Sequence, residues 1–415
     1  MLVIEGRIFF NNELTNGAIG IENGKIVDVR KTLKGDKHMN MGDRIILPGA
    51  VDPHVHFRDP GMTHKEDFVS GSLAALYGGV TCVFDMPNTK PPVLTIKELE
   101  DKKRIIKGRS FVDYGLYAAL TPGCDAERLA PLVPGFKLFM GSTTGEILVD
   151  GDPEIAKAMM SAATAGKTVS VHAEDEFLIQ KSEEKNNRDH DNNRPASAEY
   201  SAIKRLAAYK GVKINICHIT DASAVELASS LGFTMEVTTH HMFLHRGMSD
   251  GAELKVNPPL RDKNTQEMLY KAFTDGKITM LGTDHAPHTV NEKNKAYNDA
   301  PSGIPGVETY MPMLMGMVKK GNIGLNHLVK MSSVAPAETF GINKGAIQTG
   351  RDADLAIYDM SKTKKISAKH LHSKAAYTPY EGWDAIFPDT VIVRGEIQLK
   401  DGELCGEMIG ADMYE

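Results

Sequence analysis

Short apolar runs rich in β-branched residues recur at regular intervals through the middle of the chain. Eight such runs can be counted, at residues 51–57, 80–86, 112–120, 135–140, 168–174, 213–219, 234–240 and 278–284. Nearly continuous apolar runs of this length are typical of strands that are buried on both faces of a parallel sheet. We therefore expect eight parallel strands in this region.

Stretches whose apolar residues have helical spacing separate most of these runs. They lie at residues 68–77, 96–107, 153–165, 198–209, 223–231 and 265–274. Alternating strands and amphipathic helices predict βαβ units, and eight units over about 250 residues match a TIM-type (β/α)8 barrel of the α/β class. The alternative is a doubly wound open sheet, but no Gly-rich phosphate loop follows the first strand.

The two ends of the chain have a different pattern. Residues 1–48 contain short alternating strands with a turn signal at Asn23-Gly24, and residues 345–415 resume this pattern with a turn at Arg394-Gly395. We expect both ends to assemble into one small composite β-sandwich domain. It would flank a barrel domain formed by residues 49–344.

Composition narrows the classes of function. The chain has 415 residues, 41% of them hydrophobic, which is enough for one large core and a smaller second domain. A net charge of −6, and no Lys/Arg run interleaved with aromatic residues, argue against nucleic-acid binding. There is no signal peptide, no apolar stretch of membrane-spanning length and no C-x-x-C pair among the four cysteines. We therefore expect a soluble, cytoplasmic protein with no membrane partner.

The first strand-like run carries a pair of histidines, His54 and His56. Side chains at positions i and i+2 of a strand point the same way, so both imidazoles aim at one point, as in many metal sites. A single pair of this kind can also arise by chance among 15 histidines. The interpretation therefore depends on whether other strands supply further ligands.

Candidate ligands occur near the carboxyl ends of four other runs, and that end of the strands carries the active site in TIM-type barrels. They are Lys137, His172, His218 and Asp284, with His288 in the loop beyond the last strand. Each residue by itself could cap a turn or a helix. Their common place on one rim favours a metal site.

Lys137 lies in the apolar segment Gly-Phe-Lys-Leu-Phe-Met, where an unpaired ammonium is costly and would repel a divalent cation. Carbamylation by CO2 would turn this side chain into an anion whose two oxygens can bridge two metal ions. Histidine, carboxylate and carbamate ligands suit zinc. Two close ions would share a hydroxide that is nucleophilic at neutral pH. The expected ligands are His54, His56, carbamylated Lys137 and Asp284 for one ion, and the same carbamate, His172 and His218 for the other.

This constellation resembles the amidohydrolase superfamily and, within it, the dihydroorotase family, over about residues 47–350. Phe57-Arg58-Asp59-Pro60-Gly61, Asp85-Met86-Pro87-Asn88-Thr89 and Thr283-Asp284-His285-Ala286-Pro287-His288 match its motifs. The resemblance implies that Arg58, Asn88 and His288 hold a substrate carboxylate. It also implies that Asp284 is both a metal ligand and the general acid–base.

Two further segments resemble the part of the family site that contacts the substrate ring. Asn257-Pro258-Pro259-Leu260-Arg261 implies a ring contact by Asn257. The loop of residues 302–308 implies that Gly303, Pro305 and Gly306 offer backbone groups to the ring. His240 and His241 are candidates for supporting the ligands or for packing, and no role is assigned to His190.

The resemblance implies an enzyme of de novo pyrimidine biosynthesis that interconverts N-carbamoyl-L-aspartate and L-dihydroorotate. Its only expected partners are this small-molecule substrate and, as a family expectation, a second copy in a homodimer. Two alternatives stay open: an allantoinase or hydantoinase (dihydropyrimidinase) type of cyclic amidase, and a non-catalytic scaffold homologue. Arg58 together with His288 favours the dihydroorotase interpretation.

Overall fold

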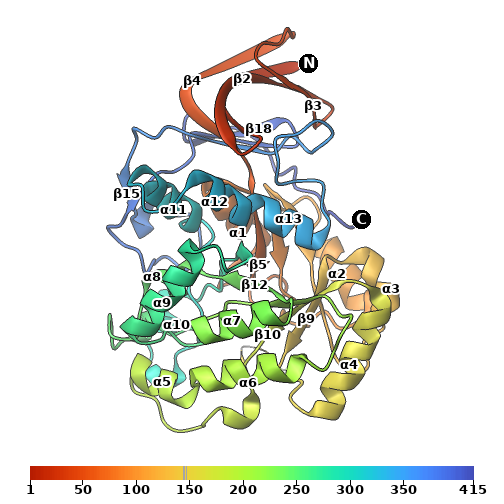
Figure 1. Cartoon of the computed structure of the whole chain (residues 1–415), viewed down its shortest axis with the longest axis vertical. Helices are drawn as coiled ribbons and strands as arrows, with labels where there is room; N and C mark the ends of the chain where they lie inside the picture. Colours follow the sequence, from red (N-terminus) through yellow and green to blue (C-terminus); the bar gives the residue numbers. More distant parts are fainter. Residues whose placement is uncertain (144, 146) are drawn as a thin grey trace.

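Short parallel strands form a closed barrel in the computed structural model, which describes residues 1–143, 145 and 147–415 (Figure 1). A backbone hydrogen bond of 2.8 Å from His56 N to His285 O closes the ring between its last and first strands. The strands are β5 (Ala50–Val55), β6 (Val80–Asp85), β7 (Asp113–Leu116), β8 (Ala118–Ala119), β9 (Gly135–Phe139), β10 (Thr168–His172), β11 (Ile214–Ile216), β12 (Thr234–Val237) and β13 (Met280–Leu281). Together β7 and β8 take the place of the third predicted strand. The predicted TIM-type barrel is confirmed.

Helices surround the barrel, and those that the sequence predicts all form. They are α1 (Phe68–Tyr77), α2 (Ile96–Ile106), α4 (Asp152–Ala165), α6 (Ala196–Leu206), α7 (Ala222–Ser230) and α9 (Lys263–Thr274). Local capping helps to fix their starts. For example, the Asp67 side chain accepts a hydrogen bond of 2.9 Å from Ser70 N at the start of α1.

Further helices lack the amphipathic pattern and were not predicted. The seven residues of α5 are all polar or charged, whereas α11 presents a methionine-rich sequence that is buried nearly all round. Neither has the apolar stripe that identifies a surface helix. The additional helices are α3 (Ala126–Leu129), α5 (Asn187–Asn193), α8 (Thr239–Phe243), α10 (Val290–Lys293), α11 (Tyr310–Lys319), α12 (Leu325–Val329) and α13 (Ala335–Phe340). No helix in the described ranges is long and apolar enough to cross a membrane.

The seventh predicted strand is shorter than expected. It ends at Val237, and Thr238 caps the short helix α8 by accepting a hydrogen bond of 3.2 Å from His241 N. His240 and His241 therefore lie on a helix and not at the end of a strand. The β-branched threonines of this segment extend the apolar pattern without extending the strand.

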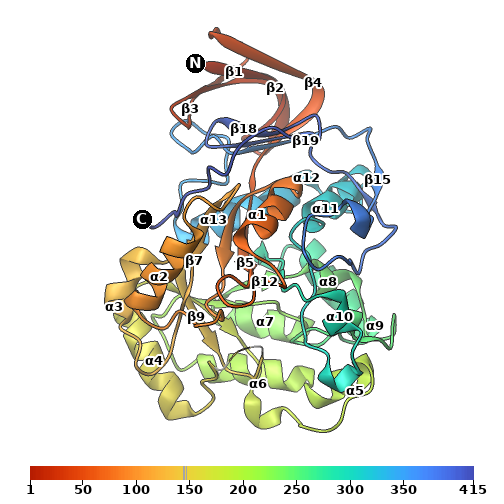
Figure 2. The same ribbon diagram turned by 180° about the vertical axis from the view of Figure 1, so that it is seen from behind.

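Strands from both ends of the chain form the second part of the molecule, as predicted (Figures 1 and 2). They make one continuous sheet in which β4 pairs antiparallel with β14, so that the two ends are joined in register. The composite β-sandwich is confirmed, while the limits at residues 48 and 345 remain predictions. The strands are β1 (Leu2–Phe10), β2 (Glu13–Glu22), β3 (Lys25–Arg30), β4 (Lys37–Pro48), β14 (Leu355–Tyr358), β17 (Thr390–Val393), β18 (Glu396–Lys400) and β19 (Glu403–Leu404).

A buried cation connects this sheet to the barrel. The Lys344 ammonium lies 2.7 Å from the Asp113 carboxylate of β7, 3.2 Å from Asp352 and within ion-pair distance of Asp354, just before β14. Burial acts to lower the pKa of Lys344, but the carboxylates outweigh it and raise that pKa. The lysine fills the space between three carboxylates that would otherwise resemble a cation site.

We expect Lys344→Met to destabilise the protein by roughly 3–5 kcal/mol, because it removes the cation that three buried carboxylates share. Asp113 keeps Arg394 and Asp352 keeps Lys25, whereas Asp354 keeps no ion-pair partner among the described residues. Thermal unfolding of the metal-loaded protein measures this as a lower melting temperature. The matched control is Lys364→Met at an exposed position, which should leave the melting temperature unchanged. Equal melting temperatures for both variants would contradict the role of Lys344.

Candidate active site

A pocket of about 370 Å³ opens at the carboxyl ends of the barrel strands. All six predicted metal ligands line it, together with four of the predicted substrate residues. Its walls are formed by His54, His56, Arg58, Asn88, Lys137, Phe139, Thr143, His172, His218, Asn257, Asp284, Ala286, Ser302 and Gly303. The barrel therefore brings residues that are far apart in the sequence to one place.

Three of the predicted ligands converge on one point. The Asp284 Oδ1 atom lies 3.0 Å from His56 Nε2 and 3.4 Å from His54 Nε2, and the donor atoms of these residues are mutually within 4.8 Å. On the other side, His172 Nδ1 lies 3.1 Å from His218 Nε2. The His218 Nδ1 atom is buried without a hydrogen-bond partner among the described residues. Such a donor set fits divalent metal ions.

The electrostatic environment keeps most of these groups in the protonation states that bind a cation. Burial lowers the pKa of His56 to about 3 and keeps the pKa of His218 well below its usual value. Burial acts to raise the pKa of Asp284, but His54 and His56 hold it well below its usual range. At neutral pH these groups are neutral imidazoles and an ionised carboxylate, which are the protonation states that metal ions require.

Two carboxylates behind the ligands were missed by the sequence interpretation. Glu236 on β12 lies 2.8 Å from His54 Nδ1, and Glu174 lies 2.7 Å from His172 Nε2. Burial and Lys137 act to lower the pKa of His54, but Glu236 helps to raise it to about 9. Carboxylates in this position orient a ligand histidine and select its tautomer. The available signal was an acidic residue inside an apolar strand-like run.

Lys137 lies on β9 with its side chain almost fully buried. Its Nζ atom is 3.0 Å from Cys217 Sγ and 5.2 Å from the centre of the Phe139 ring. Within the described parts of the chain, no carboxylate forms an ion pair with it. A buried ammonium without a counter-charge is unfavourable, so this position calls for a modified or metal-bound state.

Three of the nine described non-glycine residues with positive φ lie in this pocket. Arg58, His218 and Asp284 have φ values of +61°, +37° and +46°, in the region that residues with a side chain rarely adopt. Such conformations persist where the surrounding structure forces a side chain into a working position. Here each of the three strained residues points a polar group at the pocket.

Arg58 and His288 lie together at the pocket wall, as predicted. Arg58 is buried, and its Nη2 atom is 3.3 Å from His288 Nε2. Lys65, which the sequence interpretation missed, lies 3.1 Å from His288 Nδ1. Burial and these two cations keep the pKa of His288 well below its usual value. The ring is therefore neutral, and its Nε2–H donates to Ser302 O at 2.9 Å.

The remaining predicted substrate residues differ in their placement. The Asn88 Oδ1 atom accepts from His56 Nδ1 at 2.8 Å, so Asn88 also orients a ligand. Gly303 lines the pocket, whereas Pro305 and Gly306 line a neighbouring cavity beside His285. The substrate roles of all seven predicted residues, Arg58, Asn88, Asn257, His288, Gly303, Pro305 and Gly306, stay predictions.

Helix α8 places its two histidines near the site. His241 lies 3.0 Å from Pro258 O through Nε2 and 2.9 Å from Thr238 Oγ1 through Nδ1. His240 is buried, and its Nε2 atom has no hydrogen-bond partner among the described residues. His241 thus supports the turn that carries Asn257.

Known proteins resemble this chain over nearly its full length. The sequence model of the amidohydrolase family matches residues 45–398. The dihydroorotase of Thermoplasma volcanium is 38% identical over 98% of this chain and 96% of its own length. The dihydroorotase of Pyrococcus abyssi is 38% identical over 99% and 97%. Among solved structures, L-hydantoinase (dihydropyrimidinase) from Arthrobacter aurescens is 27% identical with a TM-score of 0.92, covering 98% of this chain and 97% of its own.

Proposed function

Because this chain belongs to the amidohydrolase family and, within it, to the dihydroorotases, we propose that its strand-end pocket interconverts L-dihydroorotate and N-carbamoyl-L-aspartate. Cyclic amide hydrolysis is the reverse of the ring closure that serves pyrimidine biosynthesis. The pocket that contains the converging histidines and Asp284 is the place of this reaction.

One observation carries the proposal: a buried arginine lines the same pocket as the metal donor set. The Nε atom of Arg58 is buried without a hydrogen-bond partner among the described residues. Burial lowers the pKa of Arg58 to about 10, which leaves the guanidinium charged at neutral pH. Dihydroorotate carries one carboxylate and carbamoyl aspartate carries two, and a guanidinium is the best side chain for this planar anion. Asn88 and His288 complete the cradle.

The donor set fits two divalent ions, most naturally zinc. His54, His56 and Asp284 would hold one ion, His172 and His218 would hold the other, and a CO2-derived carbamate on Lys137 would supply a ligand to both. Among the described residues, no carboxylate forms an ion pair with Lys137, and this supports the carbamate. Bound in this way, the ions supply activated water and polarise the amide carbonyl.

Residues of the chain transfer the proton and orient the substrate. Asp284 accepts a proton from the attacking water and delivers it to the leaving ring nitrogen, so one carboxylate serves both halves of the reaction. Arg58 and His288 anchor the carboxylate at one end of the substrate, which places the ring amide over the donor set. Asn257 contacts the ring from the opposite wall.

The working context follows from the same chemistry. We place the enzyme in the cytoplasm, where its four free cysteines remain reduced. It acts on a small molecule and assembles as a homodimer, the commonest symmetric state of soluble enzymes.

We expect Arg58→Ala to raise the KM for L-dihydroorotate by about 10- to 100-fold, since a hydrogen bond to a charged group contributes roughly 1.5–3 kcal/mol. Steady-state kinetics on the zinc-loaded protein measures it. The control is Arg104→Ala on the exposed face of α2, which should leave KM unchanged. An unchanged KM in Arg58→Ala would contradict the substrate assignment.

A hydantoinase-type cyclic amidase is the second candidate, because solved structures with this fold include L-hydantoinase and D-hydantoinase. The deciding assay compares hydrolysis of L-dihydroorotate with that of dihydrouracil, hydantoin and allantoin. Selective turnover of L-dihydroorotate supports the proposal. Turnover of a neutral ring favours the second candidate, and no turnover at all favours a non-catalytic homologue.

A further inference from the structure

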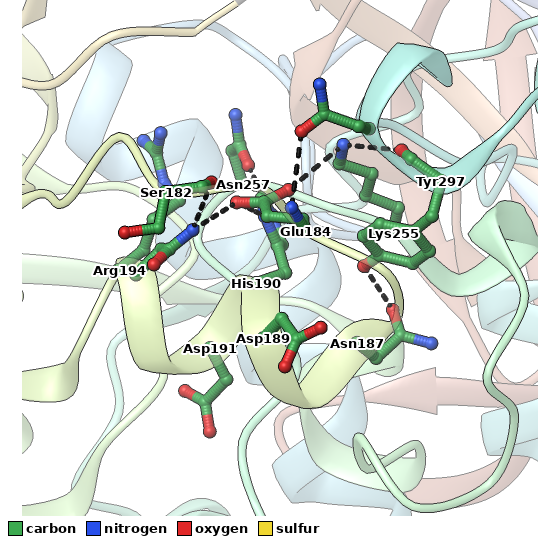
Figure 3. A network of polar contacts seen from close by, with 12 residues as sticks. Ser182, Glu184, Asn187, Asp189, His190, Asp191, Arg194, Lys255, Asn257 and Tyr297 are labelled. Carbon is green, nitrogen blue, oxygen red and sulfur yellow. Dashed lines mark hydrogen bonds and ion pairs between the residues drawn. The ribbon is translucent and has the colours of Figure 1, made fainter.

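Helix α5 and the residues before it form a polar wall beside the active site. The polar sequence of residues 181–194 suggests a solvated loop, with a segment that borders the active-site mouth as the alternative. That expectation is wrong for His190, which is only 4% exposed. Figure 3 shows the His190 ring between Glu184 and Asn257, with Lys255 on the far side of Glu184. The wall therefore contacts Asn257, which lines the pocket.

Both ring nitrogens of His190 face oxygen atoms. Nε2 lies 2.9 Å from Val256 O and 2.8 Å from Asn257 Oδ1. A backbone carbonyl can only accept, so Nε2 carries a hydrogen. Nδ1 lies 2.8 Å from a carboxylate oxygen of Glu184.

Glu184 is ionised in this network and can only accept. Burial acts to raise the pKa of Glu184, but His190 and Lys255 bring it down to about 2. The Lys255 ammonium lies 3.2 Å from the second carboxylate oxygen. Nδ1 of His190 therefore also carries a hydrogen, which makes the ring an imidazolium with Glu184 as its counter-ion.

The Nε2–H group of His190 decides how the Asn257 amide is oriented. The amide oxygen and nitrogen of an asparagine are assigned from their partners. Because Nε2–H is a donor, the atom of Asn257 that faces it is the oxygen. The amide nitrogen of Asn257 then remains available to the pocket, and it is a hydrogen-bond donor.

We propose that His190 is a positioning residue that holds the Asn257 amide with its NH2 group toward the substrate, as a donor to a ring carbonyl oxygen. This inference rests on the proposed function, since it specifies how that function recognises the ring. Without the Nε2–H donor the amide can turn over and present its oxygen to the same carbonyl, which is repulsive.

The network also connects the loops that carry the contact. Lys255 donates to Tyr297 O at 2.9 Å, and the Tyr297 hydroxyl donates to Asn187 Oδ1 at 2.9 Å (Figure 3). Residues from the loops after β10, β12 and β13 therefore hold one another. A buried, fully paired network of this kind keeps its members in a single arrangement.

Two substitutions distinguish the roles of the two ring nitrogens of His190. A glutamine side chain places an amide NH2 near the Nε2 position, whereas asparagine reaches only about as far as Nδ1. We expect His190→Asn to raise the KM for L-dihydroorotate about 10-fold, the effect of one lost hydrogen bond, with kcat within about twofold. His190→Gln should keep KM within about threefold of the wild-type value.

A double-mutant cycle distinguishes positioning from general stabilisation. If His190 acts only through Asn257, the His190→Asn/Asn257→Ala double variant should have the same KM as Asn257→Ala alone. Metal content and melting temperature are measured for all variants, because a loss of fold would lower both. Multiplicative effects on KM, or equal KM values for His190→Asn and wild type, would overturn the proposal.

Nitrogen-15 NMR of histidine-labelled, zinc-loaded protein tests the protonation of the ring without turnover. The His190 signals, identified by their loss in His190→Gln, should show two protonated nitrogens at neutral pH. Glu184→Gln should remove this signature, and Glu183→Gln at the adjacent exposed position should not. A wild-type ring without a proton on Nε2 would overturn the inference. Failure of the wild type to hydrolyse L-dihydroorotate would instead overturn the proposed function and leave this NMR result interpretable.

Discussion

Asp284→Asn is expected to lower kcat for L-dihydroorotate by roughly 10³-fold, within the range that general acid–base catalysis supplies. The amide keeps an oxygen near His54 and His56, whose Nε2 atoms lie 3.4 Å and 3.0 Å from Asp284 Oδ1. It has no lone pair basic enough to accept the proton of the attacking water. Steady-state kinetics and metal analysis of the same samples measure the two effects.

The metal content should stay close to that of the wild type, which separates proton transfer from metal loss. Asp275→Asn at the exposed end of α9 is the matched control and should leave kcat unchanged. If Asp284→Asn kept more than about a tenth of the wild-type kcat, the loss would be smaller than the roughly 100-fold contribution expected of a general base. Another group would then have to carry the proton.

Lys137→Met is expected to remove activity to a similar extent, on the order of 10³-fold or more, because water loses its activation by bound metal. Methionine fits the buried position on β9 but cannot form a carbamate. We expect the variant to bind less zinc than the wild type. Lys157→Met on the exposed face of α4 is the control and should bind zinc normally.

Carbon dioxide supplies a second test of the same position. Metal-free wild-type protein that is reconstituted with zinc in CO2-depleted buffer should regain full metal content and activity only after bicarbonate is added. Lys137→Met should not respond to bicarbonate. Complete reconstitution of the wild type without CO2 would argue against the carbamate.

Several site residues were predictable because strand geometry is local. The spacing of His54 and His56 places both rings on one side of β5, and barrel strands all end on one rim, so His172 and His218 had to lie nearby. The Arg58 motif led to the proposal that the site recognises a substrate carboxylate. None of these inferences required knowledge of loop conformation.

Features that depend on packing between distant segments were not predictable. Helix α5 has no apolar stripe, and its burial arises from ion pairs and hydrogen bonds to residues more than 50 positions away, such as Arg246 and Arg261. Helix α8 replaces the end of a predicted strand because Thr238 caps it locally. Tertiary contacts override the polar pattern of α5, whereas a local cap overrides the strand-like pattern at α8.

By itself, the sequence determined the barrel, the composite β domain and the rim that carries the ligands, because hydrophobic periodicity and strand-end position are properties of local segments. Only the tertiary structure decided which groups stand behind those ligands and how they are protonated. Glu236 beside His54 and Glu184 beside His190 are 182 and 6 positions away from their partners. At either separation, the burial of the imidazole and the acceptor that faces it decide how the ring is protonated. Burial and the facing acceptor both arise only when the chain is folded.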